Sequence, residues 1–207
     1  MPVELSVLGA FALMAAAIVV SPGPDTMLIL RASLGSGRRA GFAAVAGVQL
    51  GLGVHTALAA AGVSAAIAAS PLLFRLMALT GAGYLAFLGV ESLRHGSRLD
   101  VGRAAPASPG RACRDAMLCN LLNPKVLVLF LALYPNFIDA TRGSVAQVAT
   151  LSMVLLLINV FWQSLLVVTA AAARRRLTRP GVQRVIGRLT GSILLLFAAA
   201  MLWENVG

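Results

Sequence analysis

The sequence predicts an all-α integral membrane protein with six transmembrane helices, arranged as two inverted three-helix repeats whose first and fourth helices are broken. Of the 207 residues, 59% are hydrophobic and only 12% are charged, against about 25% charged in an ordinary soluble domain. The apolar residues fall in blocks of roughly twenty, the length that crosses a hydrocarbon layer of about 30 Å. Prolines interrupt the first and fourth blocks. This pattern excludes a soluble enzyme, a nucleic-acid-binding domain and a disordered chain.

The apolar blocks give the expected spans in order. The first block has Glu4 as its only early charge and no convincing cleavage site after it, so we expect a mature helix rather than a signal peptide. The six expected spans are Leu5–Leu30, Ala43–Ala66, Leu72–Leu93, Ala116–Ile138, Val145–Ala172 and Val185–Trp203.

The basic residues set the expected orientation. Fourteen of the 17 Lys and Arg residues lie in the first, third and fifth connections, whereas the second and fourth hold only Arg75 and Arg142. Cytoplasmic loops carry the excess of Lys and Arg, so we expect both termini in the periplasm. Contact with anionic lipid explains the arginine runs without a further partner. The fourteen are Arg31, Arg38, Arg39, Arg94, Arg98, Arg103, Arg111, Arg114, Arg174, Arg175, Arg176, Arg179, Arg184 and Arg188.

The chain divides into two similar halves. Residues 1–95 and 112–207 each hold three spans, and 96–111 reads as a cytoplasmic linker because it contains prolines and glycines. Leu79-Thr80-Gly81 recurs 110 residues later as Leu189-Thr190-Gly191, and the same offset relates Gln49 to Asn159. Because three spans is an odd number, a repeat would insert the opposite way up, giving an inverted pair.

Each half carries a helix break in its first span. Interrupted apolar segments at corresponding positions of two halves are the best pointer in a sequence to a transporter binding site. Proline removes a backbone donor and frees a carbonyl, and in lipid such backbone must face protein or a wet cavity. The breaks are Ser21-Pro22-Gly23-Pro24-Asp25 and Asn123-Pro124-Lys125.

The charged residues at these breaks are candidate substrate ligands. Asp25 is the only acidic residue well inside a span, so it is a candidate for a substrate ammonium or for a coupling proton; interaction with the free amides of a helix start is the alternative. Lys125 is the only lysine and could bind a carboxylate, pair with Asp25, or reach the inner face.

Uncharged polar residues extend the candidate site. Asn120 and Asn123 flank the second break and could contact the substrate or satisfy freed backbone groups. Gln49 is a further substrate-binding candidate; together with Asn159 and Gln163 it could line a polar path or form hydrogen bonds between helices.

Two residues are further candidates for proton coupling. His55 could relay protons or be a hydrogen-bonded packing residue, and Glu91 could act in coupling or only meet Arg94. Gly47 and Gly51 share one helix face with His55 and are better explained by close helix packing than by a pocket.

We expect no cofactor and no metal. Cys113 and Cys119 have neither a disulfide framework nor a metal-ligand spacing, and we expect two reduced thiols.

Taken together, the motifs resemble those of the LysE/RhtB family of bacterial amino-acid exporters over nearly the whole chain. The likeness rests on the paired breaks and on the segments around them. Phe and Gly usually stand upstream of the asparagines in that family, where this chain has Cys113 and Ala116. The matching segments are Ser21-Pro22-Gly23-Pro24-Asp25-Thr26, Arg39-Ala40-Gly41, Gly81-Ala82-Gly83-Tyr84-Leu85, Asn120-Leu121-Leu122-Asn123-Pro124-Lys125 and Pro135-Asn136-Phe137.

The resemblance implies a multi-pass protein of the bacterial inner membrane that exports amino acids or their derivatives, driven by proton entry. Its partners would be the amino acid, protons and the lipid bilayer, with no nucleic acid and with a homodimer as a possible assembly. We expect the zwitterion to lie between the broken helices, its carboxylate at Asn123–Lys125 and its amine at Asp25.

Two other functions are alternatives. Another small metabolite or a metal cation could be the cargo, but cation export would need several acidic ligands inside the spans. A membrane-embedded enzyme or electron carrier would need an acid cluster, a zinc motif, a nucleophile with its base, or a cysteine in each half, and the sequence offers none of these.

Overall fold

All regular secondary structure that the structure describes is helical, without a strand in the described residues. The structure is a computed structural model, and it describes residues 2–21, 23–70, 72, 76, 79–80, 82–83, 86–87, 89–90, 93–94, 107–123, 126, 129–130, 134–170, 172 and 179–206. Its elements are α1 (Leu5–Val20), α2 (Pro24–Ala69), α4 (Pro109–Leu121), the 3-10 helix η1 (Tyr134–Phe137), α6 (Ser144–Val168) and α8 (Pro180–Val206).

The first expected span, Leu5–Leu30, comprises two elements. α1 ends at Val20, where the Ser21 amide still donates to the Ala17 carbonyl at 3.2 Å. α2 begins at Pro24, a residue suited to the first position of a helix because that position needs no amide donor. Pro22 lies outside the described residues.

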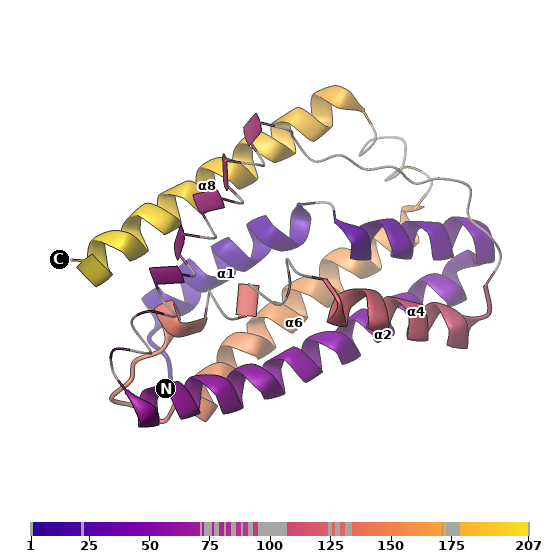
Figure 1. The fold of residues 1–207 in the computed structure, drawn as a ribbon. Coiled ribbons are helices and arrows are strands. Elements are labelled where there is room, and N and C mark those ends of the chain that lie inside the picture. The colour runs from indigo at the N-terminus through magenta and orange to yellow at the C-terminus, as the bar shows by residue number, and fades with distance from the viewer. Residues whose placement is uncertain are drawn as a thin grey trace.

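The first connection, between the expected spans Leu5–Leu30 and Ala43–Ala66, is a kink between two helices and is shorter than predicted. α2 extends through it to Ala69 as two helices that meet at a kink, so the expected second span lies in the helix after the kink. No proline occurs between Asp25 and Ala69 to end it. Gly37 alone has non-helical backbone, with φ 82° and ψ 178°, a conformation that glycine adopts readily because it lacks a Cβ. The chain therefore changes direction at Gly37, inside the expected connection (Figure 1).

The expected linker 96–111 also ends earlier than predicted. Ser108 caps α4, its hydroxyl oxygen accepting from the Arg111 amide at 3.4 Å, and Pro109 occupies the first turn. A serine followed by proline is a helix-start signal, so the last residues assigned to the linker are helical. α4 then ends at Leu121, well inside the expected span Ala116–Ile138.

The helices pack in two overlapping groups. α2 contacts α4 and α6, and α1 contacts α6 and α8. Figure 1 shows both termini, η1 and the start of α6 at one end of the bundle, and the starts of α4 and α8 with the end of α6 at the other. Described residues between 72 and 94 are helical, and Gly89 among them lies against Gly191 of α8.

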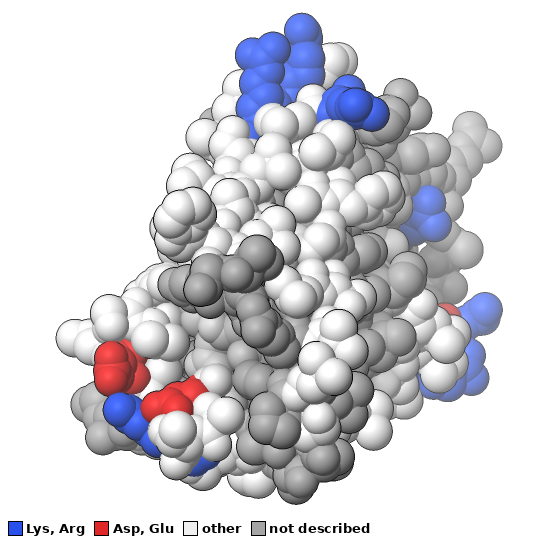
Figure 2. Space-filling model, turned by 60° about the vertical axis from the view of Figure 1, so that its left-hand side comes forward, with Lys and Arg blue, Asp and Glu red and all other residues white. Residues whose placement is uncertain are grey.

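The outer surface is apolar. Among the described residues, three helical stretches are long and apolar enough to cross a membrane, Pro24–Gly62, Ser144–Val168 and Pro180–Ala200, and α1 is a shorter apolar helix. Large side chains such as Leu157, Phe161 and Trp203 are exposed on the outside, where lipid would cover them. Figure 2 shows charged side chains gathered toward the extremities of one face, with white surface between them. These features describe a multi-pass membrane protein.

Candidate functional site

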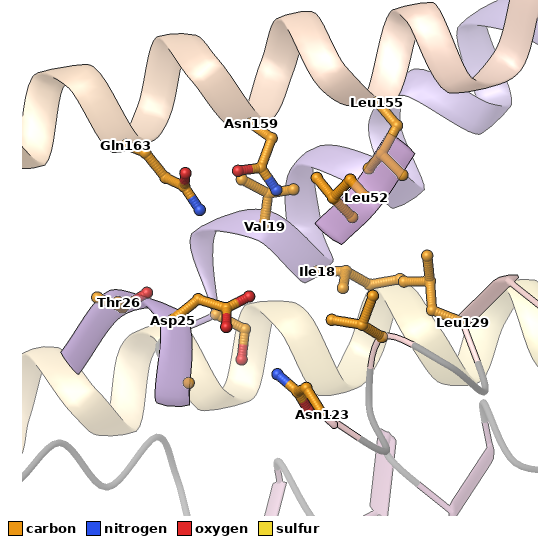
Figure 3. Close-up of a pocket in the computed structure, with 13 residues that line it drawn as sticks. Ile18, Val19, Asp25, Thr26, Leu52, Asn123, Leu129, Leu155, Asn159 and Gln163 are labelled. Carbon is orange, nitrogen blue, oxygen red and sulfur yellow. The ribbon is translucent and has the colours of Figure 1, made fainter. Parts of the chain in front are cut away.

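A small polar cavity lies in the interior where α1 ends and α2 begins. Its volume is about 60 Å³, enough for several water molecules and well below the roughly 300 Å³ of a small ligand pocket. Leu52, Leu129 and Leu155 are among the apolar residues of its wall. Figure 3 shows polar side chains extending toward it from both sides. The polar lining residues are Ser21, Asp25, Thr26, Asn123, Asn159 and Gln163.

Asp25 joins the first half of the chain to the second at this cavity. It stands in the first turn of α2, and its Oδ2 accepts a hydrogen bond of 2.8 Å from Nδ2 of Asn120, near the end of α4. Asn120 is completely buried. The Cys119 thiol also lies close to the Asp25 carboxylate. The two segments that carry the sequence breaks are therefore in direct contact.

Asn123 follows the end of α4 and lines the cavity. Its amide donates to the Asn120 carbonyl at 3.1 Å, and its own carbonyl accepts from the Val126 amide at 3.0 Å. Asn123 is 6% exposed, so this turn is inside the protein. Pro124 and Lys125, the other residues of the second break, lie outside the described residues.

Three amide side chains meet on the α6 side of the cavity. Nε2 of Gln49, on α2, donates to Oδ1 of Asn159 at 3.3 Å and to Oε1 of Gln163 at 3.2 Å. Asn159 and Gln163 line the cavity, whereas Gln49 stands behind them and is not among its lining residues. Of the two alternatives that the sequence left open, the structure shows the inter-helix hydrogen bonds, and two of the three side chains also line the cavity.

His55 lies beside this site without lining the cavity. Its Nε2 is 3.4 Å from the Asn120 carbonyl oxygen, and its ring stacks on Phe130 at 5.6 Å between centroids. His55 is thus a buried residue linked to the residue that holds Asp25. Glu91 lies outside the described residues.

Close helix packing at glycines brings α2 and α4 together, as predicted. A Cβ at Gly51 would lie 2.6 Å from Oδ1 of Asn120, and one at Gly47 would overlap the Cys113 carbonyl oxygen. Neither glycine leaves room for a side chain. Because both lack one, α2 and α4 pack closely enough for Asn120 to reach Asp25.

Sequence reasoning missed several lining residues. Thr26 is buried and lines the cavity beside Asp25, and its only signal was its position one residue after the break. Leu52 and Leu155 also escaped notice, because an apolar residue in an apolar helix carries no signal of a cavity. Within the described part of the chain, no three His, Cys, Asp or Glu side chains are grouped as a metal site would require.

A second polar cluster lies at the end of the bundle that holds the N-terminus. Arg142 forms ion pairs of 3.2 Å with Glu4 and 3.0 Å with Asp139. Hydrogen bonds from the Thr141 hydroxyl and amide hold the pKa of Asp139 below its ordinary value. This cluster borders a surface cavity of about 240 Å³.

Buried amides and a carboxylate inside an apolar helical bundle are typical of membrane transport proteins. Residues 16–205 match the model of the LysE type translocator family, and the chain belongs to that family. No solved structure matches it.

Curated relatives cover most of the chain. The chain is 32% identical to the membrane protein YrhP of Bacillus subtilis, over 88% of this chain and 92% of the relative. It is 28% identical to the homoserine/homoserine lactone efflux protein of Salmonella typhimurium, over 93% and 94%. It is 30% identical to the leucine efflux protein of Salmonella choleraesuis, over 89% of each chain.

Proposed function

We propose that the protein is a secondary transporter that exports an amino acid or amino-acid derivative from the cytoplasm in exchange for protons. The observation that carries the proposal is the cavity built by both halves of the chain, with Asp25 bonded across to Asn120. Family membership and relatives named for homoserine and leucine efflux support an exporter of amino acids.

The substrate would lie at this cavity, between the two helix breaks. Asp25 is the one acidic residue among the described residues that line it, and we assign it the substrate amine. The substrate carboxylate belongs to the second break, around Asn123 and Lys125. Because the cavity holds only a few waters, the surrounding helices must move apart to admit a substrate, as alternating access requires.

Competition at Asp25 would couple the two fluxes. A carboxylate can hold a proton or an ammonium group but cannot stabilise both at once. Proton entry from the periplasm would release the substrate amine, and loss of the proton to the cytoplasm would prepare the carboxylate for the next substrate. His55, which contacts the Asn120 carbonyl, and Glu91 remain further candidates for the proton route.

The pairing of Gln49 with Asn159 supports an inverted repeat of six spans. These residues are related by the 110-residue offset, and their side chains form a hydrogen bond of 3.3 Å. Equivalent residues of two repeats that touch must lie close to the pseudo-two-fold axis. The grouping of the starts of α4 and α8 at the end opposite the termini supports an orientation with both termini in the periplasm of the inner membrane (Figure 1).

Transport by purified protein in liposomes tests the proposal. Liposomes loaded with labelled L-homoserine or L-leucine receive a gradient of two pH units, acid outside, which supplies about 2.7 kcal/mol per proton. We expect the wild type to release the amino acid faster under the gradient, and Asp25→Asn to lose that acceleration. Asp115→Asn, which removes a partly exposed carboxylate paired with Arg111 and Arg114 on α4, is the matched control.

Each outcome has a separate meaning. Unchanged gradient-driven efflux in Asp25→Asn would remove Asp25 from the coupling scheme. Absence of efflux by the wild type across a full panel of amino acids would overturn amino-acid export. Growth of deletion and overexpression strains on inhibitory amounts of each amino acid would select the members of that panel.

A further inference from the structure

The amides on the α6 wall of the cavity form a built site that neither helix break accounts for. Asn159 and Gln163 stand one turn apart on α6, so both face the same side. They are 8% and 4% exposed, and both line the cavity. In Figure 3 they extend from α6 toward the cavity, across from Asp25. Two buried amides in an apolar helix are costly unless their hydrogen-bonding groups find partners.

Gln49 fixes which end of each amide faces the cavity. Its single nitrogen donates to the oxygen of Asn159 and to the oxygen of Gln163, at 3.3 and 3.2 Å. Both oxygens are thereby directed at Gln49. The amide nitrogens, each with two N–H donors, are the groups left to meet a ligand in the cavity.

We infer that Asn159 and Gln163, oriented by Gln49, form a specificity subsite that selects amino acids whose side chain carries an uncharged hydrogen-bond acceptor, such as a hydroxyl or a carbonyl. This inference rests on the proposed function and assigns its substrate class. With the amine at Asp25 and the carboxylate at the second break, the side chain is the part of the substrate that remains to meet the α6 wall.

The chemistry of the subsite distinguishes three kinds of side chain. A hydroxyl or carbonyl oxygen accepts from the amide N–H groups and replaces the water that they lose. An aliphatic side chain displaces the water and leaves the donors unpaired, which is the principle by which polar pockets reject apolar analogues. A cationic side chain meets donors only and is repelled.

Gln49 is a positioning residue in this arrangement. Its own Oε1 is buried and has no hydrogen-bond partner among the described residues. An unpaired buried carbonyl does not stabilise the fold. We therefore assign Gln49 the role of orienting the amides of Asn159 and Gln163.

The test compares two substrates of nearly identical size. L-Homoserine and L-norvaline differ by a hydroxyl in place of a terminal methyl, and release of each labelled compound is measured from liposomes that hold the wild type or Gln163→Leu. We expect the wild type to prefer homoserine by about 10- to 100-fold in initial efflux rate. In Gln163→Leu this preference should fall by about tenfold, with norvaline efflux retained or raised.

Three further variants control for misfolding and for the general effect of removing a polar group. Gln163→Met keeps the side-chain length and should show the same loss of preference if the leucine variant does not fold. Gln49→Leu should reduce the preference while the protein stays monodisperse, because the amides are then free to rotate. Thr150→Val removes a hydroxyl that donates to the Ala146 carbonyl of the same helix, α6, and should leave the homoserine-to-norvaline ratio unchanged.

Failure of this inference is distinct from failure of the proposed function. Efflux of norvaline at least as fast as homoserine by the wild type, or an unchanged ratio in both Gln163 variants, would overturn the subsite while leaving amino-acid export intact. Absence of efflux for every amino acid tested would overturn the function and the subsite together.

Discussion

Replacing Gly47 by alanine is expected to force α4 away from α2. The added Cβ would overlap the carbonyl oxygen of Cys113 and lie 2.8 Å from its carbonyl carbon and 3.0 Å from the Met117 nitrogen. Carbon contacts normally begin near 3.5 Å. Because these atoms belong to the backbone of α4, no side-chain rotation can relieve the overlap, and the helix itself must shift.

The size of the effect follows from two opposing contributions. Overpacking of a tight contact costs about 3 kcal/mol when backbone must move, and alanine gains about 1 kcal/mol over glycine in a helix interior. The net loss is about 2 kcal/mol, which lowers the apparent melting temperature by about 4–8 °C for a chain of this size.

Gly53 provides the matched control on the same helix. A Cβ there would meet nothing within 4 Å, so Gly53→Ala keeps only the gain in helix propensity and should raise the apparent melting temperature by about 2–4 °C. Thermal scans of detergent-solubilised protein by fluorescence-detected size-exclusion chromatography measure both. Equal melting temperatures for the two alanine variants would refute the packing argument.

Three further predictions follow from other contacts. Gly51→Ala should leave a folded protein whose gradient-driven efflux falls about tenfold or more, because its Cβ at 2.6 Å from Oδ1 of Asn120 displaces the side chain that bonds Asp25; efflux at the wild-type rate would contradict this. Thr141→Ala should flatten the pH dependence of stability on the acid side, because it removes a hydrogen bond that lowers the pKa of Asp139. A carboxyl group with a lowered pKa contributes stability above its ordinary pKa of about 4, and this stability is lost as the pH falls through the lowered value. Melting scans of both proteins between about pH 3 and 7, a range that includes the ordinary pKa, make the comparison. Tyr134→Phe removes a buried hydrogen bond of 2.7 Å to the serine hydroxyl of α6 and should lower the apparent melting temperature by about 2–4 °C, whereas an unchanged value would show that the serine finds another partner.

Local features of the sequence predicted much of the helical framework. The apolar blocks correctly indicated helices, of which three stretches among the described residues are long and apolar enough to cross a membrane. The family indicated by the paired breaks is the one that the chain belongs to. The sequence was less reliable at boundaries. The connection that holds Arg31, Arg38 and Arg39 is shorter than predicted, because arginine is a good helix former and only Gly37 departs from helical backbone.

The candidate site was predictable only in part. Asp25, Asn120 and Asn123 were singled out because they flank breaks, and the structure brings all three to one place. Thr26 belongs to the motif that carries the family resemblance but was not singled out as a site residue. The leucines of the wall were not singled out either, because nothing in their local sequence marks a cavity.

Local sequence sets where helices start, at Pro24, at the Ser108–Pro109 pair and at Pro180, because capping and proline geometry act over one turn. Of these three starts, only the break before Pro24 was predicted from the sequence. Only the tertiary structure decided which polar groups meet. Asn120 reaches a partner 95 residues away in the chain, and Gln49 reaches partners 110 and 114 residues away. Such meetings depend on how closely and at what angle helices cross, which is settled by the packing of many side chains at once and is not written in any local pattern.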